Sequence, residues 1–379
     1  MSRSPSAGHV TRVLERPDAH LIAQWRDLAT RAAEANPFAE PDVVVPAMRH
    51  LDGRDAALLT VWDGDRLDAL LPVRWPMRIP LPGGRWLPLP AWEATTLPYR
   101  PLGTPLLDRT RAVDAAAALL RPPVSARRPA AMLGVRAFSD DGPVAAAFDE
   151  ALAGGGRTVL RLKTYQRAVF LSDSGTTPGK SGRRRYRQVR AAREKLDQQV
   201  GVSTILDRSG DPSAVEDFLR LEASGWKGRA GSALACRPEH ADWFREMCAG
   251  LAAQGRLELL SLRAGGKDLA MECCLLAGED AFHLKAAYDE AYADYVPGMQ
   301  PLLHVIDGQG GKAHRRDSCT LPDNALMNSL WPDRRTLSTV LLPLHGAVGG
   351  ATLGLVRGAR RTVGRGRAAV GRLRKRSEA

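Results

Sequence analysis

The first part of the chain alternates apolar and polar residues first at helical and then at strand spacing. Between residues 17 and 35 apolar side chains recur every three to four positions, which predicts one face of a helix. Apolar runs follow at 57–62 and 67–75, and the turn-forming residues Asp63-Gly64-Asp65-Arg66 join them. These patterns predict a helix followed by a β-hairpin. Two further apolar runs, at 158–162 and 167–172, predict strands that close the first half.

The second part of the chain predicts a longer run of alternating elements. A helical stripe begins near Lys180, and Asp211-Pro212 provides an N-cap and a proline at the first position of a later helix. That helix is expected to bury Trp226. The remaining expected elements are a strand at 201–207, a helix at 238–253, three strands at 256–263, 269–277 and 281–289, a helix at 298–309 and a strand at 337–342.

The two parts resemble each other. Aligned without gaps at an offset of 201 residues, segment 58–69 falls on 259–270, with two leucines, a glycine and an alanine identical. Each of these hairpins follows a helix and precedes a loop at a similar distance. We interpret this as an internal duplication, in which the hairpins at 57–75 and 257–277 take equivalent places.

The order of the expected elements defines the fold class. A helix, a strand, two helices, a three-stranded antiparallel meander, a helix and a strand indicate an α+β fold. The chain has 379 residues, enough for two compact domains. We therefore expect an N-terminal half at 1–175, a C-terminal half at 176–343 and a tail at 344–379.

Composition and charge narrow the class of protein. Apolar residues make up 44% and charged residues 25%, as in an ordinary globular protein. The five cysteines are odd in number and form no CxxC pair, so we expect reduced thiols. The N-terminal residues lack the apolar core of a signal peptide, and the stretch 340–356 is too short and too rich in glycine to span a membrane. A cytoplasmic protein is expected.

The net charge of +12 is concentrated at the C-terminus. Nine arginines and lysines and a single glutamate lie in residues 344–379, so this segment carries eight of the twelve net charges. The rest of the chain is nearly neutral. Such a tail is either a solvated appendage or a helix that binds an anionic membrane surface.

Several common catalytic and cofactor motifs are missing. The sequence contains no GxxxxGK[ST], no GxGxxG that opens a βαβ unit and no GxSxG. It also lacks HExxH and any local cluster of histidines and cysteines, so no metal is expected.

One set of motifs carries a family resemblance. The run FHLKAAYDEAYADYVPGMQPLLHVID at 282–307 follows SGWKG at 224–228 and precedes DSCT at 317–320 and LWPDRR at 330–335. In this order and spacing the motifs resemble the GNAT-like acetyltransferases named after the cellulose-biosynthesis protein CelD. NPFAEPD at 36–42 is similar to the first segment of that family. The family is itself similar to Fem-type aminoacyltransferases, which contain two GNAT folds in one chain.

The resemblance implies two GNAT-like halves, each a mixed, largely antiparallel sheet flanked by helices, and a thioester donor, acetyl-CoA. Its pyrophosphate is expected at the helix start formed by Val296, Pro297, Gly298 and Met299. A helix N-terminus offers unpaired amides to an anion, and a glycine allows close approach to the backbone. The Q/RxxGxG/A pattern of the usual GNAT pyrophosphate loop is absent here.

Acyl transfer also needs a base, donors for the oxyanion and an acid for the leaving thiolate. Lys285 is the expected oxyanion or substrate donor, at a position where the family has a lysine. Asp289 and Asp317 are alternative bases or substrate clamps, and Tyr288 and Tyr295 are alternative acids. We expect Lys285, Asp289, the Pro297-Gly298 helix start and Asp317 to line one cleft, because Lys285 and Asp289 share a face of a regular strand.

Trp226 and Lys227 are expected on the acceptor side, although packing is an alternative role for Trp226. The acceptor implied by kinship is an amine or hydroxyl of a sugar or cell-envelope precursor. Two other functions stay open. The basic helix from Lys180 to Lys195 could bind charged tRNA as the donor of an aminoacyltransferase, while other nucleic acids are not expected. The chain could also be a non-catalytic double-GNAT protein that binds an anionic surface through its tail.

Overall fold

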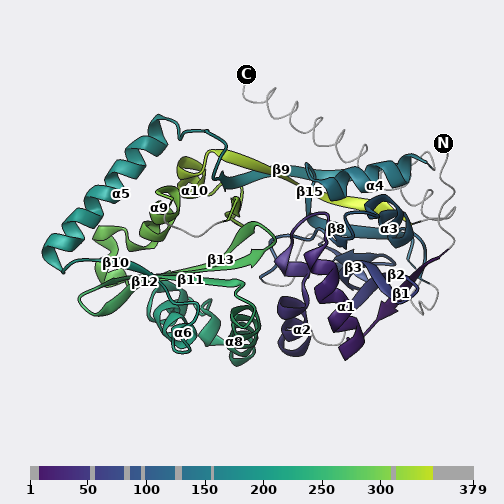
Figure 1. The fold of residues 1–379 in the computed structure, drawn as a ribbon, viewed down its shortest axis with the longest axis horizontal. Helices are drawn as coiled ribbons and strands as arrows, with labels where there is room; N and C mark the ends of the chain where they lie inside the picture. Colours follow the sequence, from purple (N-terminus) through teal and green to yellow (C-terminus); the bar gives the residue numbers. More distant parts are fainter. Residues whose placement is uncertain are drawn as a thin grey trace, which may run out of the picture.

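The structure is a computed structural model. It describes residues 8–51, 56–80, 86–94, 99–123, 130–154, 158–308 and 313–344. One long mixed sheet runs through the molecule, with helices on both of its faces (Figure 1). The first half of the chain builds one end of this sheet and the second half builds the other.

The elements of the first half begin with a strand and two helices, of which the sequence predicted the first helix. They are β1 (His9–Leu14), α1 (Ala19–Thr30), η1 (Pro37–Ala39), α2 (Pro41–His50), β2 (Ala56–Asp63), β3 (Arg66–Arg74), β4 (Met77–Pro80), β5 (Trp86–Leu89), β6 (Trp92–Ala94), β7 (Leu106–Leu107), α3 (Ala112–Leu119), β8 (Met132–Ser139), α4 (Pro143–Ala153) and β9 (Leu160–Leu171).

The second half repeats this order after a long basic helix. Its elements are α5 (Lys180–Gln199), β10 (Thr204–Asp207), α6 (Ala214–Ser224), α7 (Trp226–Arg229), η4 (Leu234–Cys236), α8 (Pro238–Ala252), β11 (Leu257–Ala264), β12 (Lys267–Ala277), β13 (Asp280–Tyr288), η5 (Glu290–Tyr295), η6 (Pro297–Met299), α9 (Gln300–Ile306), β14 (Arg315–Asp317), α10 (Ala325–Leu330) and β15 (Asp333–Pro343). Figure 1 shows α6 and α8 on one face of the sheet, with α5, α9 and α10 on the other.

The strand order of the main sheet reveals an exchange between the halves. It runs β1-β2-β3-β6-β8-β15-β9-β14-β13-β12-β11-β10, with β7 beside β3. β15, the last strand of the second half, pairs with β8 of the first half. β9, the last strand of the first half, pairs with β14 of the second half. The two exchanged strands also pair with each other, which makes the sheet continuous.

This order confirms the internal duplication. Read from either end of the sheet, β1, β2, β3, β6, β8 and β15 correspond to β10, β11, β12, β13, β14 and β9. The parallel pairs also correspond, since β6 lies parallel to β8 and β13 lies parallel to β14. Both hairpins carry a register shift at matching positions, between Val61 and Trp62 and between Leu262 and Arg263. These positions differ by the 201 residues found in the sequence alignment.

Some expected elements differ from those observed. The runs at 158–162 and 167–172 form one strand, β9, and it does not close the first half beside β8. β15 likewise does not close the second half, because it pairs with β8 of the first half. Local patterns cannot reveal such long-range pairing. The helix expected at 298–309 is shorter, because η6 replaces its first turn and α9 ends at Ile306.

Apolar side chains form separate cores on the two faces of the second half. Phe218, Phe244 and Ala287 belong to the core beneath α6 and α8. Leu196 of α5 and Tyr288 of β13 belong to a core on the opposite face. Leu344, the first residue of the expected tail, is buried, and residues 345–379 lie outside the described part of the chain. No helix among the described residues is long and apolar enough to cross a bilayer.

Candidate functional site

In the middle of the second half, strand β13 separates from the neighbouring strand β14. β13 pairs with β14 over only three residues, Asp280 to Phe282, but continues to Tyr288. Along its other edge β13 pairs with β12 over its full length. Among the described residues, no strand pairs with 283–288 on the β14 side. This segment therefore presents an open strand edge inside the sheet.

The direction of the backbone groups along this edge follows from the β12 pairing. The amide of Asp289 donates to Leu269 O at 2.9 Å, so Asp289 and Leu269 form a hydrogen-bonded pair. Hydrogen-bonded and non-hydrogen-bonded positions alternate in an antiparallel ladder. The amides and carbonyls of Ala286 and Tyr288 consequently point to the open edge.

A β-bulge sets the side chains around this edge. The register of β12 and β13 shifts between Cys273, opposite Lys285, and Cys274, opposite His283, so Leu284 is an extra residue. His283 and Lys285 would share a face in a regular strand. The bulge turns Lys285 toward α6 and His283 toward the other face.

Lys285 belongs to a polar group that we call the edge cluster, formed by Glu222, Lys227, Lys285, Tyr99 and His240. Lys285 Nζ donates to Glu222 Oε1 at 2.8 Å, and Lys227 Nζ lies 3.2 Å from the same oxygen. Lys227 Nζ also donates to Ala286 O at 2.6 Å. The cluster thus directly adjoins the open edge of β13.

The pKa values of Glu222 and Lys227 in the edge cluster depend on burial and on the neighbouring groups. Burial alone raises the pKa of Glu222, but Lys285, the backbone amide of Leu234 and Lys227 outweigh burial and hold the pKa below its ordinary value. Leu234 N donates to Glu222 Oε2 at 2.8 Å. For Lys227, burial outweighs the attraction of Glu222 and lowers the pKa. Glu222 is therefore an ionised carboxylate shared by two amines.

Tyr99 brings a residue of the first half into the edge cluster. Its ring lies 5.0 Å from Lys285 Nζ and stacks on Trp243 with centroids 4.7 Å apart. Its hydroxyl lies 2.7 Å from His240 Nδ1. Burial and the Glu222 charge raise the pKa of Tyr99 to about 12, while burial and Arg237 lower the pKa of His240. The hydroxyl therefore donates to a neutral imidazole.

The expected donor segment is placed after β13, at the start of α9. Val296 has left-handed backbone angles, and Pro297 and Met299 are buried. Gly298 lies against Tyr288, since a Cβ built on Gly298 would be 3.3 Å from Tyr288 Cδ1. Tyr288 packs in the core below α5, on the face opposite Lys285.

The remaining expected site residues have identifiable contacts. Asp289 caps η5 through a bond from the amide of Ala291 at 2.9 Å. Tyr295 donates its hydroxyl to Gln199 at 2.8 Å. Trp226 was expected to be buried in the stripe of the preceding helix, but this is wrong, because Trp226 begins α7 and is 51% exposed.

Asp317 is not at the edge cluster. It is fully buried between two arginines of the exchanged strands, with Arg167 Nη2 at 2.7 Å and Arg335 Nη1 at 2.8 Å from its Oδ2. Burial alone raises its pKa, but Arg167 and Arg335 outweigh burial and hold the pKa well below the usual range. A carboxylate so placed is a poor proton acceptor, so the geometry does not support Asp317 as a base.

The single cleft expected from the sequence is therefore not formed. The structure brings Lys285 and Lys227 together around Glu222, and it brings Gly298 next to Tyr288 on the other face of β13. Asp317 lies in a third environment. The bulge at Leu284 does not cause this error, because the register of β13 is regular from Lys285 to Tyr288, and the expectation fails instead at Gly298 and Asp317.

Sequence patterns missed Glu222, Tyr99 and His240. Glu222 carried a signal, since it follows Phe218 by four residues on the apolar stripe of α6 and is 2% exposed. A carboxylate at a core position indicates a charged partner. Tyr99 and His240 carried no such signal, because the first lies in an irregular segment and the second in a polar first turn.

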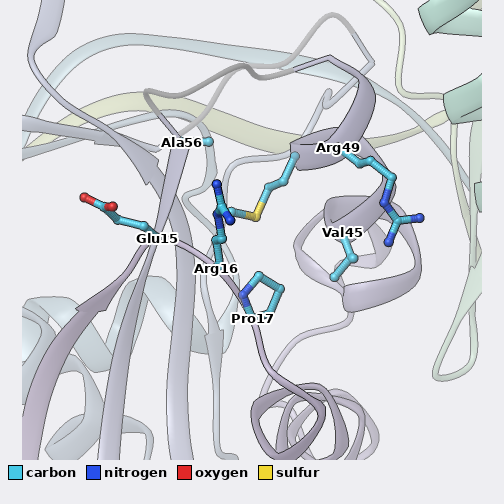
Figure 2. Close-up of a pocket in the computed structure, with 7 residues that line it drawn as sticks. Glu15, Arg16, Pro17, Val45, Arg49 and Ala56 are labelled. Atoms are coloured by element: carbon cyan, nitrogen blue, oxygen red, sulfur yellow. The ribbon is translucent and has the colours of Figure 1, made fainter.

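A separate cavity of about 830 Å³ lies in the first half, between the start of β2 and α2 (Figure 2). Figure 2 shows the Arg16 side chain between Ala56 on one side and Val45 and Arg49 on the other. None of the residues expected from the sequence and none of the edge cluster lines this cavity.

The chain is similar to a known family over part of its length and to solved structures over most of it. The family model described as Acetyltransferase (GNAT) domain matches residues 183–309, which include β13 and most of the edge cluster. No curated protein matches the chain. The structure of FemX has a TM-score of 0.53 at 11% identity, covering 88% of this chain and 97% of that one. The C-terminal domain of a putative lysylphosphatidylglycerol synthetase from Agrobacterium fabrum has a TM-score of 0.51 at 12% identity, covering 88% and 94%.

These similarities define the class of protein. The chain has an α+β fold of two GNAT-like halves, and its residues 183–309 correspond to a GNAT-type acyltransferase domain. The similarities do not identify the substrates.

Proposed function

We propose that the protein transfers an acetyl group from acetyl-CoA to an amine or hydroxyl of a sugar or cell-envelope precursor. The observation that carries the proposal is the open edge of β13 beside the edge cluster. An extended chain with amide groups can pair with such an edge. The pantetheine arm of coenzyme A is a chain of this kind, and the amides of Ala286 and Tyr288 face it.

The residues around the edge suit the chemistry of acyl transfer. With the thioester carbonyl at the edge, the Lys285 ammonium is a donor for the developing oxyanion. The acceptor loses a proton when it attacks. That proton can pass to the Tyr99 hydroxyl oxygen while the Tyr99 proton moves to His240 Nδ1, 2.7 Å away. The departing thiolate then takes the proton from the imidazolium of His240, directly or through a water molecule, which leaves Tyr99 and His240 as they began.

The acceptor side of the proposal rests on Trp226 and Lys227. Trp226 exposes about half of its surface at the start of α7, next to Lys227 of the edge cluster. An exposed aromatic face suits a ring compound that can stack on it. A contact of the C-terminal tail with an anionic membrane surface would bring the protein to an envelope precursor.

The direct test is thermal unfolding with acetyl-CoA, with buffer alone and with aminoacylated tRNA. A ligand at 100 times its dissociation constant stabilises the folded state by about 2.7 kcal/mol. We expect acetyl-CoA to raise the melting temperature and free CoA to do so as well. If only the aminoacylated tRNA stabilised the protein, the donor would be the aminoacylated tRNA and not acetyl-CoA. No stabilisation by either ligand would favour a non-catalytic role.

The tRNA alternative is supported by one feature of α5. Arg184, Arg185 and Arg187 are exposed, and none forms an ion pair with the residues that the structure describes. Exposed arginines without acidic partners suit a phosphate backbone. The apolar residues of α5, Val189 and Leu196, are buried in the protein, so the helix presents only its polar face.

Replacing Gly298 with valine is expected to raise the KM for acetyl-CoA about tenfold with little change in kcat. The new side chain would crowd Tyr288 at the 3.3 Å contact and displace the start of α9, where the pyrophosphate is proposed to bind. Steady-state kinetics at varied acetyl-CoA measure the effect. Gly154→Val is the matched control, because a Cβ at Gly154 meets nothing within 4 Å. An unchanged KM in folded Gly298→Val would place the donor elsewhere.

A further inference from the structure

Three side chains with metal-binding atoms meet on the face of the sheet opposite the edge cluster. Glu272 and Cys274 lie on β12, and His283 lies on β13 directly opposite Cys274. One ligand atom from each lies within 4.8 Å of the others. Glu272 and Cys274 are buried, and the His283 side chain is 16% exposed. The group thus combines a carboxylate, a thiol and an imidazole away from bulk water.

The backbone positions this group through the bulge of β13. Residues 272 and 274 share a face because strand side chains alternate. His283 would point to the other face in a regular strand, together with Lys285. The extra residue Leu284 reverses its direction and aims it at Glu272. Bulges often serve to redirect a side chain in this way.

We propose that Glu272, Cys274 and His283 bind a zinc ion through Oε1, Sγ and Nδ1, with water as the fourth ligand. Zinc takes sulfur at about 2.3 Å and nitrogen or oxygen at about 2.0–2.2 Å in a tetrahedral site, which sets ligand atoms roughly 3.3–3.6 Å apart. The Cys274 Sγ to Glu272 Oε1 distance is 3.6 Å and already fits. The 2.7 Å contact of His283 Nδ1 with Glu272 Oε1 has to open by about 0.6 Å.

The charges around the group allow a dication to be buried there. The carboxylate of Glu272 and a thiolate of Cys274 balance the two charges of zinc. The adjacent Glu258 and Arg316 are joined by bonds of 2.6 and 2.9 Å and neutralise each other. Zinc binding therefore leaves no net charge in the buried site, which removes the main cost of burying an ion.

A cavity lies beside this group, on the side of β11. Glu258 is the register partner of Cys274 on β11, and together with Arg316 it lines a cavity of about 570 Å³. Ser172 and His314 also line this cavity.

A second group of similar composition is unsuitable. His9, Asp63 and Asp68 also lie close together, but Arg111 bonds to both carboxylates and Arg66 lies 3.1 Å from Asp68. These guanidinium groups already neutralise the carboxylates and would repel a cation.

The zinc site would join β12 to β13 immediately beside Lys285, and the inference does not depend on the proposed activity. The test is to incubate the purified full chain with zinc sulfate, remove free metal by gel filtration and measure bound zinc by mass spectrometry. We expect about one equivalent per chain, with a higher melting temperature that a chelator reverses. Replacing zinc with cobalt should give a thiolate-to-metal charge-transfer band, which only a cysteine ligand produces.

Cys274→Ser should abolish both the cobalt band and the bound metal. His283→Gln changes a partly exposed position and should lower the bound metal at least tenfold. Cys236→Ser is the control, because Cys236 is an exposed thiol outside the group and its loss should change neither result. Less than about a tenth of an equivalent in the wild-type chain overturns the proposal. So does a cobalt band that survives in Cys274→Ser, or metal that survives in folded His283→Gln.

Discussion

Replacement of Lys285 by methionine is expected to lower kcat for acyl transfer by about 10²- to 10³-fold, with a much smaller change in the KM for acetyl-CoA. The reason is that an oxyanion exists only after the acceptor attacks, so a donor to it contributes to the transition state and not to donor binding. Lys285 is held for this role by Glu222 at 2.8 Å and by the Tyr99 ring below its ammonium.

A change at Lys285 also affects the buried carboxylate, so stability has to be measured alongside activity. Glu222 keeps Lys227 and the amide of Leu234 as partners in the variant. The matched control is Lys267→Met, which removes an exposed amine at the start of β12. We expect wild-type kinetics from that control. Wild-type kcat in a folded Lys285→Met variant would remove Lys285 from the reaction.

The features of the fold that the sequence predicts are those encoded locally or by repetition. Alternating apolar runs located both hairpins, and the register shifts that the structure shows in them are separated by the same 201 residues. The exchange of β9 and β15 carried no such signal, because the local pattern of apolar and polar residues does not determine which strand becomes the neighbour. The positions of β9 and β15 in the sheet depend on contacts made across the whole chain. These contacts include the buried charges of Arg167, Asp317 and Arg335.

The candidate site was also predicted from the sequence only in part. Lys285 and Lys227 were identified from motifs in the second half, and the structure joins them around a carboxylate. The faces of His283 and Lys285 relative to each other could not be assigned from the sequence, because a bulge of one residue between them reverses one face and leaves no clear mark in the composition. Tyr99 was missed for a different reason. It comes from the first half, and only the packing of Tyr99 on Trp243 brings it to the site.

Asp317→Asn is expected to reduce the free energy of unfolding by about 3–5 kcal/mol, and to affect kcat far less than Lys285→Met does. Asp317 is the fully buried partner of Arg167 and Arg335, and its Oδ1 also accepts the amide of Cys319 at 2.9 Å. Removing the negative charge leaves two guanidinium groups buried with too little compensation. Among the residues that the structure describes, Arg335 keeps a bond to Glu34, while Arg167 keeps only the carbonyl of Pro101.

The pH dependence of stability provides a second measurement on the same variant. Because the folded pKa of Asp317 is depressed, its stabilising contribution is complete above the unfolded pKa of about 4 and is lost as the pH falls toward the folded value. Urea unfolding from pH 7 down to pH 3 should therefore show a shallower loss of stability in Asp317→Asn than in the wild type. Asp294→Asn, at an exposed position, should change stability by less than about 0.5 kcal/mol at every pH. If Asp317→Asn instead kept wild-type stability and lost kcat, the carboxylate would act in the reaction and its burial between the arginines would need another explanation.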